Sequence, residues 1–293
     1  FPRSQFWNDA TFRLADDSFT AKKTERAAKL IDELLAAKLP ADLMAHALYL
    51  KGELETAAES WDRVAEVMGQ LAHDFPDSSL RLPAEYWVAE AAYRQGKFED
   101  AGKRFALIAD QAGGRHEKWM AMIPLRRAQV LAQEKKWADA QAMAAGIEQD
   151  FPAFSEKYEA DYLLGRAAAA QADFDAARRS YTKVIRSSTG GKSETAAMAQ
   201  WMIGETYFHQ ENFEGALREY LRVEILYPYP RWQAAAVLQA GKCQEALGRN
   251  KEAAELYAKL IKVYRNTEFT DEAAKRLHNV ESATAARATK SGN

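Results

Sequence analysis

Apolar and polar residues alternate along the chain at helical spacing, and the pattern is clearest over residues 196–228. Counted from Gly204, apolar residues stand at plus three, nine, twelve, sixteen and nineteen, and a proline at plus twenty-four: Tyr207, Phe213, Ala216, Tyr220, Val223 and Pro228. Small residues let two helix backbones approach, large ones fill the remaining space, and proline ends a helix. The stretch therefore predicts two amphipathic helices folded back on each other.

The same pattern recurs along nearly the whole chain. The position of Gly204 recurs at intervals of 36, 37, 39, 37, 39 and 37 residues: Asp16, Gly52, Ala89, Ala128, Gly165, Gly204 and Gly241. Nine positions later an aromatic residue stands in most repeats: Trp61, Phe98, Trp137, Phe174 and Phe213. A helix pair of this size cannot bury its apolar face alone, so successive pairs are predicted to stack.

This pattern resembles the tetratricopeptide repeat (TPR), which carries small and aromatic residues at these places. The resemblance implies an all-α fold, a right-handed α-α superhelical solenoid of about seven helix pairs over residues 1–269. The repeats are expected at about residues 1–40, 41–77, 78–114, 117–152, 153–189, 194–228 and 231–265. A capping helix with Thr270 as N-cap is expected over 270–287, followed by a flexible tail over 288–293.

Two repeats depart from the pattern. The first has Asp16 in place of a small residue, which is expected of a terminal repeat with one face toward water. The second has neither glycine nor asparagine over residues 55–60, so this segment reads as continuous helix and predicts an unusual junction.

Composition narrows the possible functions. The 40 Lys and Arg residues nearly balance the 42 Asp and Glu residues, so a net charge of -2 gives no bulk attraction to nucleic acid. No run of eighteen apolar residues is present, so no membrane span is predicted. The single cysteine, Cys243, cannot form an intrachain disulfide and is expected to pack as a small apolar residue. Because the sequence begins at Phe1 without a methionine, we expect a processed or partial chain.

A search for catalytic and metal-binding motifs finds none that is complete. Gly191-Lys192-Ser193 ends like a phosphate-binding loop, but Arg186 stands where that motif requires glycine. The five histidines show no metal-type pair at helical spacing. We therefore expect no enzyme, no cofactor and no metal. Charge clusters such as Arg178-Arg179 are interpreted as a solvated face of the outer helices.

In TPR proteins the first helix of each pair lines a concave groove. The resemblance implies that residues at minus three, plus one, plus four and plus five from the small-residue position point into it. The candidate partner-binding residues are Tyr49, Glu53, Tyr86, Glu90, Tyr93, Tyr162, Arg166, Trp201, Glu205 and Phe208. Aromatic side chains would supply contact area, and the acids would favour a basic or backbone-donor partner. The alternative is that the aromatics pack between adjacent first helices.

The sequence thus favours a non-catalytic scaffold or adaptor that binds a peptide or a partner-protein segment. Segments such as DFPDS and YPYP at repeat boundaries resemble bacterial cell-envelope TPR proteins of the Tol-Pal coordinator and outer-membrane assembly lipoprotein type. That resemblance implies a periplasmic or outer-membrane-associated setting, with the cytoplasm as the alternative. Two other functions stay open: the regulatory or substrate-recruiting arm of a larger enzyme or assembly, and a self-assembling homo-oligomeric scaffold. The lysine–asparagine set of chaperone-binding TPRs is missing, so that subtype is disfavoured.

Overall fold

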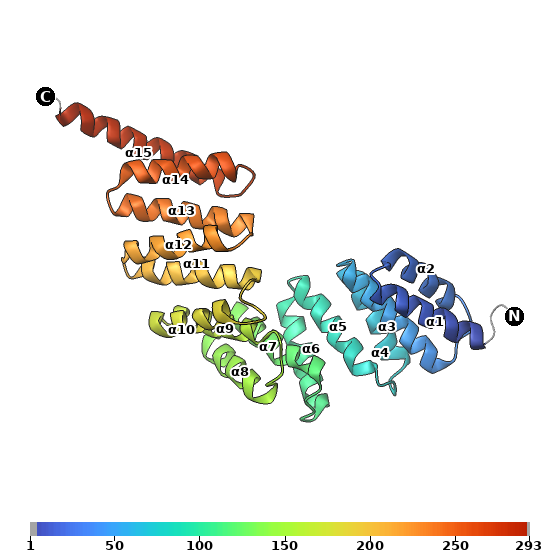
Figure 1. The fold of residues 1–293 in the computed structure, drawn as a ribbon. Coiled ribbons are helices and arrows are strands. Elements are labelled where there is room, and N and C mark those ends of the chain that lie inside the picture. The colour runs from blue at the N-terminus through green and yellow to red at the C-terminus, as the bar shows by residue number, and fades with distance from the viewer. Residues whose placement is uncertain (1–4, 292–293) are drawn as a thin grey trace. The chain divides into compact units, whose positions relative to one another are not determined.

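The computed structural model describes residues 5–291, and all regular secondary structure in that range is helical (Figure 1). The bounds are α1 Gln5–Thr20, α2 Thr24–Leu35, α3 Ala41–Ala57, α4 Trp61–Asp74, α5 Arg81–Arg94, α6 Phe98–Ala112, a 3-10 turn at Lys118–Ala121, α7 Met122–Gln133, α8 Trp137–Asp150, α9 Lys157–Ala170, α10 Phe174–Arg186, α11 Glu194–His209, α12 Phe213–Leu226, α13 Pro230–Ala246, α14 Asn250–Val263 and α15 Thr270–Ser291. The prediction of an all-α fold of about seven helix pairs plus a C-terminal helix is confirmed. Over these residues no helix is long and apolar enough to cross a membrane.

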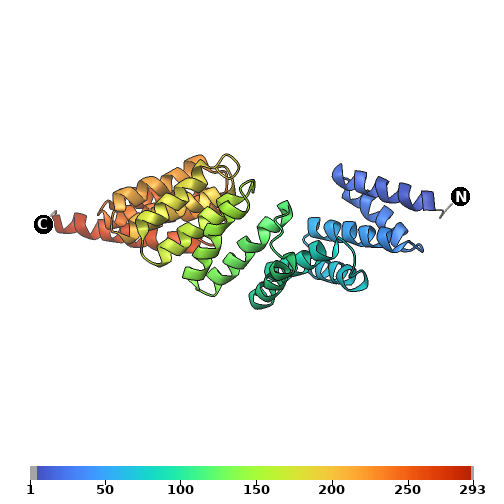
Figure 2. The same ribbon diagram turned by 90° about the horizontal axis from the view of Figure 1, so that it is seen from below.

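The helices form two compact units, residues 1–135 with α1–α7 and residues 136–293 with α8–α15. Within each unit a helix packs on its neighbour in sequence, and α11 also contacts α9 and α13 (Figures 1 and 2). The sequence predicted a single run of repeats over 1–269. The boundary between these two units falls after α7, within the repeat expected at 117–152, and the expected repeat bounds stay a prediction.

Small residues and large side chains interlock where the paired helices cross. A Cβ atom added to Gly204 would lie 2.6 Å from Cε1 of Tyr220, too close for any residue but glycine. The same holds for Gly52 against Met68, whose Cε would be 2.4 Å away. The predicted role of the small-residue position as a helix-crossing point is therefore found in both units.

A residue with positive φ ends the first helix of every pair. These residues recur at intervals of 37 to 39 positions: Lys22, Glu59, Gly96, Lys135, Ala172, Glu211 and Gly248. Only two are glycine, although the left-handed region disfavours all other residues. The second repeat shares this turn, because α3 ends at Ala57 and α4 begins at Trp61. The interpretation of residues 55–60 as continuous helix was wrong.

The regular turns correct the register of the first repeat. In the other six repeats the left-handed residue stands seven positions after the small residue. In the first repeat the left-handed residue is Lys22, and the residue seven positions before it is Ala15, not Asp16. Ala15 is fully buried, whereas Asp16 is exposed. The first repeat therefore has a small residue at its crossing point after all.

The C-terminal helix differs in detail from the expectation. α15 packs on α14, buries Ala273 and Val280, and continues to Ser291 rather than ending at 287. Thr270 is its first residue, but its hydroxyl donates to the carbonyl of Thr267 instead of capping the helix. The predicted tail over 288–293 is thus helical as far as Ser291, and residues 292–293 lie outside the described part.

Candidate functional site

The ten predicted groove residues divide equally between the units. Tyr49, Glu53, Tyr86, Glu90 and Tyr93 lie in the first unit, on α3 and α5, and the other five lie in the second. Each set of five therefore lies within one unit. Neither unit contains a group of three or more His, Cys, Asp or Glu side chains placed to hold a metal ion, as far as the chain is described.

In the first unit Tyr86 and Glu90 are interior residues. Tyr86 is 8% exposed, and its ring centroid lies 5.4 to 5.9 Å from those of Trp87, Phe105 and Trp119. Glu90 is only 2% exposed. Neither side chain reaches the surface, so neither offers a contact to a partner segment.

An arginine that the sequence pattern missed holds the buried Glu90. Arg126 donates to the two carboxylate oxygens of Glu90 over 2.6 and 2.8 Å, and Arg94 donates over 2.7 Å. Arg126 also lies 4.9 Å over the ring of Tyr93. A buried carboxylate is tolerated only with such partners. Arg126 stands two positions before the small residue Ala128, and this position is not one of the four that the TPR resemblance assigns to the groove.

Tyr49 and Glu53 are half-buried on α3. The hydroxyl of Tyr49 accepts a hydrogen bond from the Trp87 indole over 3.3 Å. Burial, reinforced by the nearby charge of Asp16, raises the pKa of Glu53. Among the described residues Glu53 has no hydrogen-bonding or ion-pair partner, so its half-buried carboxylate depends on solvent for hydrogen bonds.

In the second unit Arg166 and Glu205 line one pocket of about 360 Å³. The first helices α9 and α11 contribute most of its wall, and α8 and α10 each contribute their first residue. We call it the Arg166 pocket; its lining is Trp137, Arg166, Ala169, Ala170, Phe174, Met202, Glu205, Thr206 and His209. Two of the predicted residues that are far apart in sequence are thus brought together.

The two charged groups of the Arg166 pocket differ in their bonding. The Arg166 guanidinium lies 5.6 Å over the Trp137 ring and has no carboxylate or hydrogen-bond partner among the described residues. Glu205 accepts hydrogen bonds from the Tyr220 hydroxyl at 2.5 Å and from Gln239 at 2.7 Å. The pocket therefore presents one unpaired cation beside a carboxylate that is already partly satisfied.

Stacked aromatic rings form another wall of the Arg166 pocket. The rings of Phe174 and His209 are parallel, with centroids 6.1 Å apart. The sequence had given Trp137 and Phe174 only a packing role, as the aromatics that follow the small residue by nine positions. Their exposure beside Arg166 was not foreseen, because that position begins the second helix of each pair.

The remaining predicted residues of this unit are mainly packing residues. Tyr162 lies against Tyr181 with ring centroids 5.7 Å apart, and burial raises the pKa of Tyr162 to about 12. Trp201 on α11 lies 5.9 Å from Trp232 on α13, and Phe208 meets Phe213 edge-on at 5.3 Å. All three are half-buried. Only the Trp201 contact joins adjacent first helices, which is the alternative considered for the aromatics; the other two contacts join the two helices of one pair.

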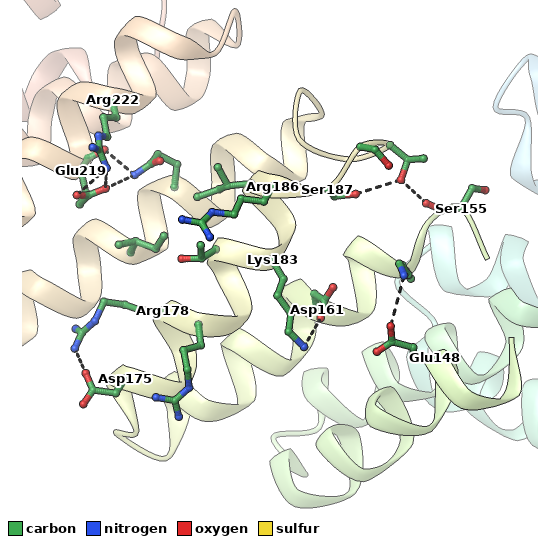
Figure 3. A pocket seen from close by; sticks show the side chains of 18 of the residues that line it. Glu148, Ser155, Asp161, Asp175, Arg178, Lys183, Arg186, Ser187, Glu219 and Arg222 are labelled. Carbon is green, nitrogen blue, oxygen red and sulfur yellow. Dashed lines mark hydrogen bonds and ion pairs between the residues drawn. The ribbon is translucent and has the colours of Figure 1, made fainter. Parts of the chain in front are cut away.

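A larger pocket of about 1050 Å³ lies along α10, and most of the charged side chains that line it form ion pairs with one another (Figure 3). The pairs are Lys183 with Asp161, Lys157 with Glu148, Arg222 with Glu219 and Arg178 with Asp175. Arg179 is exposed, as predicted for a solvated face, but the Arg178 side chain is only 17% exposed and lies over the Tyr207 ring. Paired, solvated charges contribute little to recognition, so this larger pocket is not the preferred site.

The thiol of Cys243 is not a candidate for chemistry. The side chain is fully buried, and burial raises its pKa to about 12. A thiol that stays protonated is a poor nucleophile. The expected role as a small packing residue is in keeping with this environment.

Comparison with sequence-family models identifies repeats in the second half of the chain. Models described as tetratricopeptide repeat match residues 125–192, 162–230 and 235–267. No curated protein sequence matches the chain.

Solved structures of similar fold span nearly the whole chain. A tetratricopeptide repeat protein from Parabacteroides merdae is 12% identical with a TM-score of 0.66, and the match covers 92% of this chain and 98% of that one. The apo quorum sensor NprR from B. thuringiensis is 14% identical with a TM-score of 0.69, covering 93% and 79%. NprR in complex with its cognate peptide NprX is 14% identical with a TM-score of 0.59, covering 94% and 83%. At these identities the likeness establishes the fold alone.

Proposed function

Because the chain is a tetratricopeptide-repeat protein, we propose that it is a non-catalytic interaction module that binds a segment of a partner protein at the Arg166 pocket. The observation that carries this proposal is the pocket itself. It combines an unpaired guanidinium and a carboxylate from adjacent first helices with a pair of stacked aromatic rings from α10 and α11. Such a mixture of apolar walls and a few oriented polar groups is typical of a recognition site.

The proposal has further support in the fold. NprR, whose fold is similar, has been solved in complex with a peptide. In this chain the aromatic walls supply contact area without loss of much side-chain entropy, and Arg166 and Glu205 fix orientation and register. A bacterial cell-envelope setting remains part of the proposal and is based on the sequence resemblance.

The test uses a spot array of N-acetylated peptides attached through their C termini. We expect a subset of peptides to bind the wild-type protein. Trp137→Ala and Arg166→Ala should each weaken that binding by more than ~1 kcal/mol, because each removes a side chain that lines the pocket and contacts the bound segment. Arg218→Ala is the matched control, since Arg218 is an exposed arginine on α12 outside the pocket.

Two outcomes would count against the proposal. The first is equal peptide binding by wild type and both pocket variants, with helicity unchanged. The second is no peptide binding at all. If the mass measured by light scattering then also grows with protein concentration, the self-assembling scaffold is favoured instead.

A further inference from the structure

Three tyrosines occupy equivalent places in the last three helix pairs. Each stands sixteen residues after the glycine at its helix crossing: Tyr181 after Gly165, Tyr220 after Gly204 and Tyr257 after Gly241. A Cβ added to those glycines would lie 2.5, 2.6 and 2.3 Å from the Cε1 atom of the respective ring. The three rings are therefore fixed in the same way against their first helices.

Only two of the three hydroxyls have an acceptor. Tyr220 donates to Glu205 at 2.5 Å, and Tyr257 donates to Glu245. The Tyr181 hydroxyl has no hydrogen-bond partner, although Tyr181 is fully buried. An unsatisfied buried hydroxyl costs on the order of 1–3 kcal/mol, so its presence calls for an explanation.

The sequence explains why the acceptor is missing. Glu205, the acceptor for Tyr220, stands one position after Gly204, and the residue one position after Gly165 is Arg166. Glu245, the acceptor for Tyr257, stands four positions after Gly241, and the residue four positions after Gly165 is Ala169. Arg166 and Tyr162 are the ionisable groups close to the Tyr181 hydroxyl. At these two positions this repeat thus lacks the acid found in each of the two repeats that follow it, and a cation stands at the first position.

The missing acid coincides with the Arg166 pocket. Arg166, Ala169 and Met202 all line the pocket. Met202 stands two residues before Gly204, and the equivalent residue of the next repeat, two before Gly241, is Gln239. Gln239 is one of the donors that hold Glu205. The positions that hold a carboxylate and its amide partner in the next repeat are here Arg166 and Met202, and both line the pocket.

We propose that a carboxylate from an aspartate or glutamate of the partner segment takes the place of the missing glutamate, bound by the Arg166 guanidinium and by the hydroxyl of Tyr181. This inference rests on the proposed function and names the chemistry of its ligand. The guanidinium offers a fork of N–H donors to the carboxylate, and the hydroxyl donates to it as Tyr220 donates to Glu205. The site completes in the complex the bond that the free protein lacks.

Two features of the pocket set the limits of this recognition. Glu205 stands on the same wall and repels a second anion, so the segment must present a backbone N–H or another donor beside its acid. The Tyr181 oxygen is covered in the free protein, so the carboxylate reaches it only after the side chains above it rotate. The ligand is thus an isolated acidic residue rather than a polyacidic run.

The binding test compares three peptide arrays. Two arrays carry N-acetylated peptides attached through their C termini. The acidic array contains peptides with Asp and Glu, and the neutral array contains the same peptides with Asn and Gln at those positions. The third presents neutral peptides with free C-terminal carboxylates. We expect wild type to favour the acidic array about tenfold, a preference lost in Arg166→Gln, reduced at least about fivefold in Tyr181→Phe and kept in Arg218→Gln.

The outcomes separate this inference from the proposed function. Equal binding to the acidic and neutral arrays, both weakened by Trp137→Ala, overturns the carboxylate site and leaves the segment-binding function intact. A preference for the third array alone overturns the assignment to a side chain. Binding to none of the arrays overturns both proposals.

A measurement without ligand tests the geometry itself. Arg166→Glu places an acid where Glu205 stands in the next repeat and should give the Tyr181 hydroxyl its acceptor. In a double-mutant cycle with Tyr181→Phe, we expect a favourable coupling of the introduced carboxylate to the hydroxyl in the free energy of unfolding. No coupling would mean that the hydroxyl does not face this position, which overturns the inference.

Discussion

At the scale of single residues, the tyrosine at the helix crossing shows how one position differs between repeats. Tyr181, Tyr220 and Tyr257 share their burial and their packing against glycine, yet the Tyr181 hydroxyl has no acceptor. Spacing alone predicts the ring, because a small residue facing a large one recurs. It does not predict the hydroxyl's partner, which depends on a residue from the first helix.

This difference predicts opposite effects of one substitution. Tyr220→Phe should lower the free energy of unfolding by roughly 1–2 kcal/mol, because Glu205 loses a donor. Tyr181→Phe should leave it unchanged or raise it, because a buried hydroxyl without a partner is removed. Urea unfolding followed by circular dichroism compares the two. A larger loss in Tyr181→Phe than in Tyr220→Phe would refute this account of the pocket.

Glu53 provides a pH-dependent prediction in the first unit. Its folded pKa is raised above the ordinary value of 4.5, mainly by burial, so its contribution to stability is present below that value and is lost as pH rises through the folded pKa. Glu53→Gln should therefore stabilise the protein at neutral pH, by under about 1 kcal/mol because the side chain is half-exposed, and the gain should vanish in acid. A gain of equal size at acidic and neutral pH would contradict the assignment.

At the scale of helices and turns, the sequence predicted the elements better than their junctions. Helical spacing and the Gly204-type positions located the pairs, because these positions report contacts between two neighbouring helices. The left-handed turn residue can be recognised from the sequence only where it is glycine or asparagine, and residues 55–60 contain neither. Elsewhere packing of the two helices imposes the same turn on residues that disfavour it, and propensity gives no signal of it.

The turns predict a gain from glycine. Ala172 has a φ of +58°, so Ala172→Gly should relieve the left-handed strain and raise the free energy of unfolding by roughly 1 kcal/mol. Gly248 has a φ of +74°, and no atom lies within 4 Å of a Cβ added there. Gly248→Ala should therefore lower the free energy of unfolding by roughly 1 kcal/mol, because of the backbone conformation alone. Thermal melts of both variants are the measurement. Stabilisation by Gly248→Ala would show that the turn geometry is misassigned.

At the scale of the whole molecule, the repeat pattern predicted the fold and only part of the candidate site. Arg166 and Glu205 were found from their place beside the crossing glycine, and they line one pocket. Glu90 has the same place but is buried beneath Arg126, a residue from the next pair that no spacing within one repeat reveals. Whether a groove position faces solvent or a neighbouring helix is thus decided by the adjacent repeat.

The central claim is that one repeat lacks the acid that each of the two following repeats carries beside its tyrosine, and that a partner segment binds in the pocket at this place. The most direct measurement is calorimetric titration of the best-bound array peptide into wild type and Arg166→Glu. The account predicts at least about tenfold weaker binding in Arg166→Glu, because the protein then supplies its own carboxylate and repels that of the ligand. Equal affinity for the two proteins would contradict it.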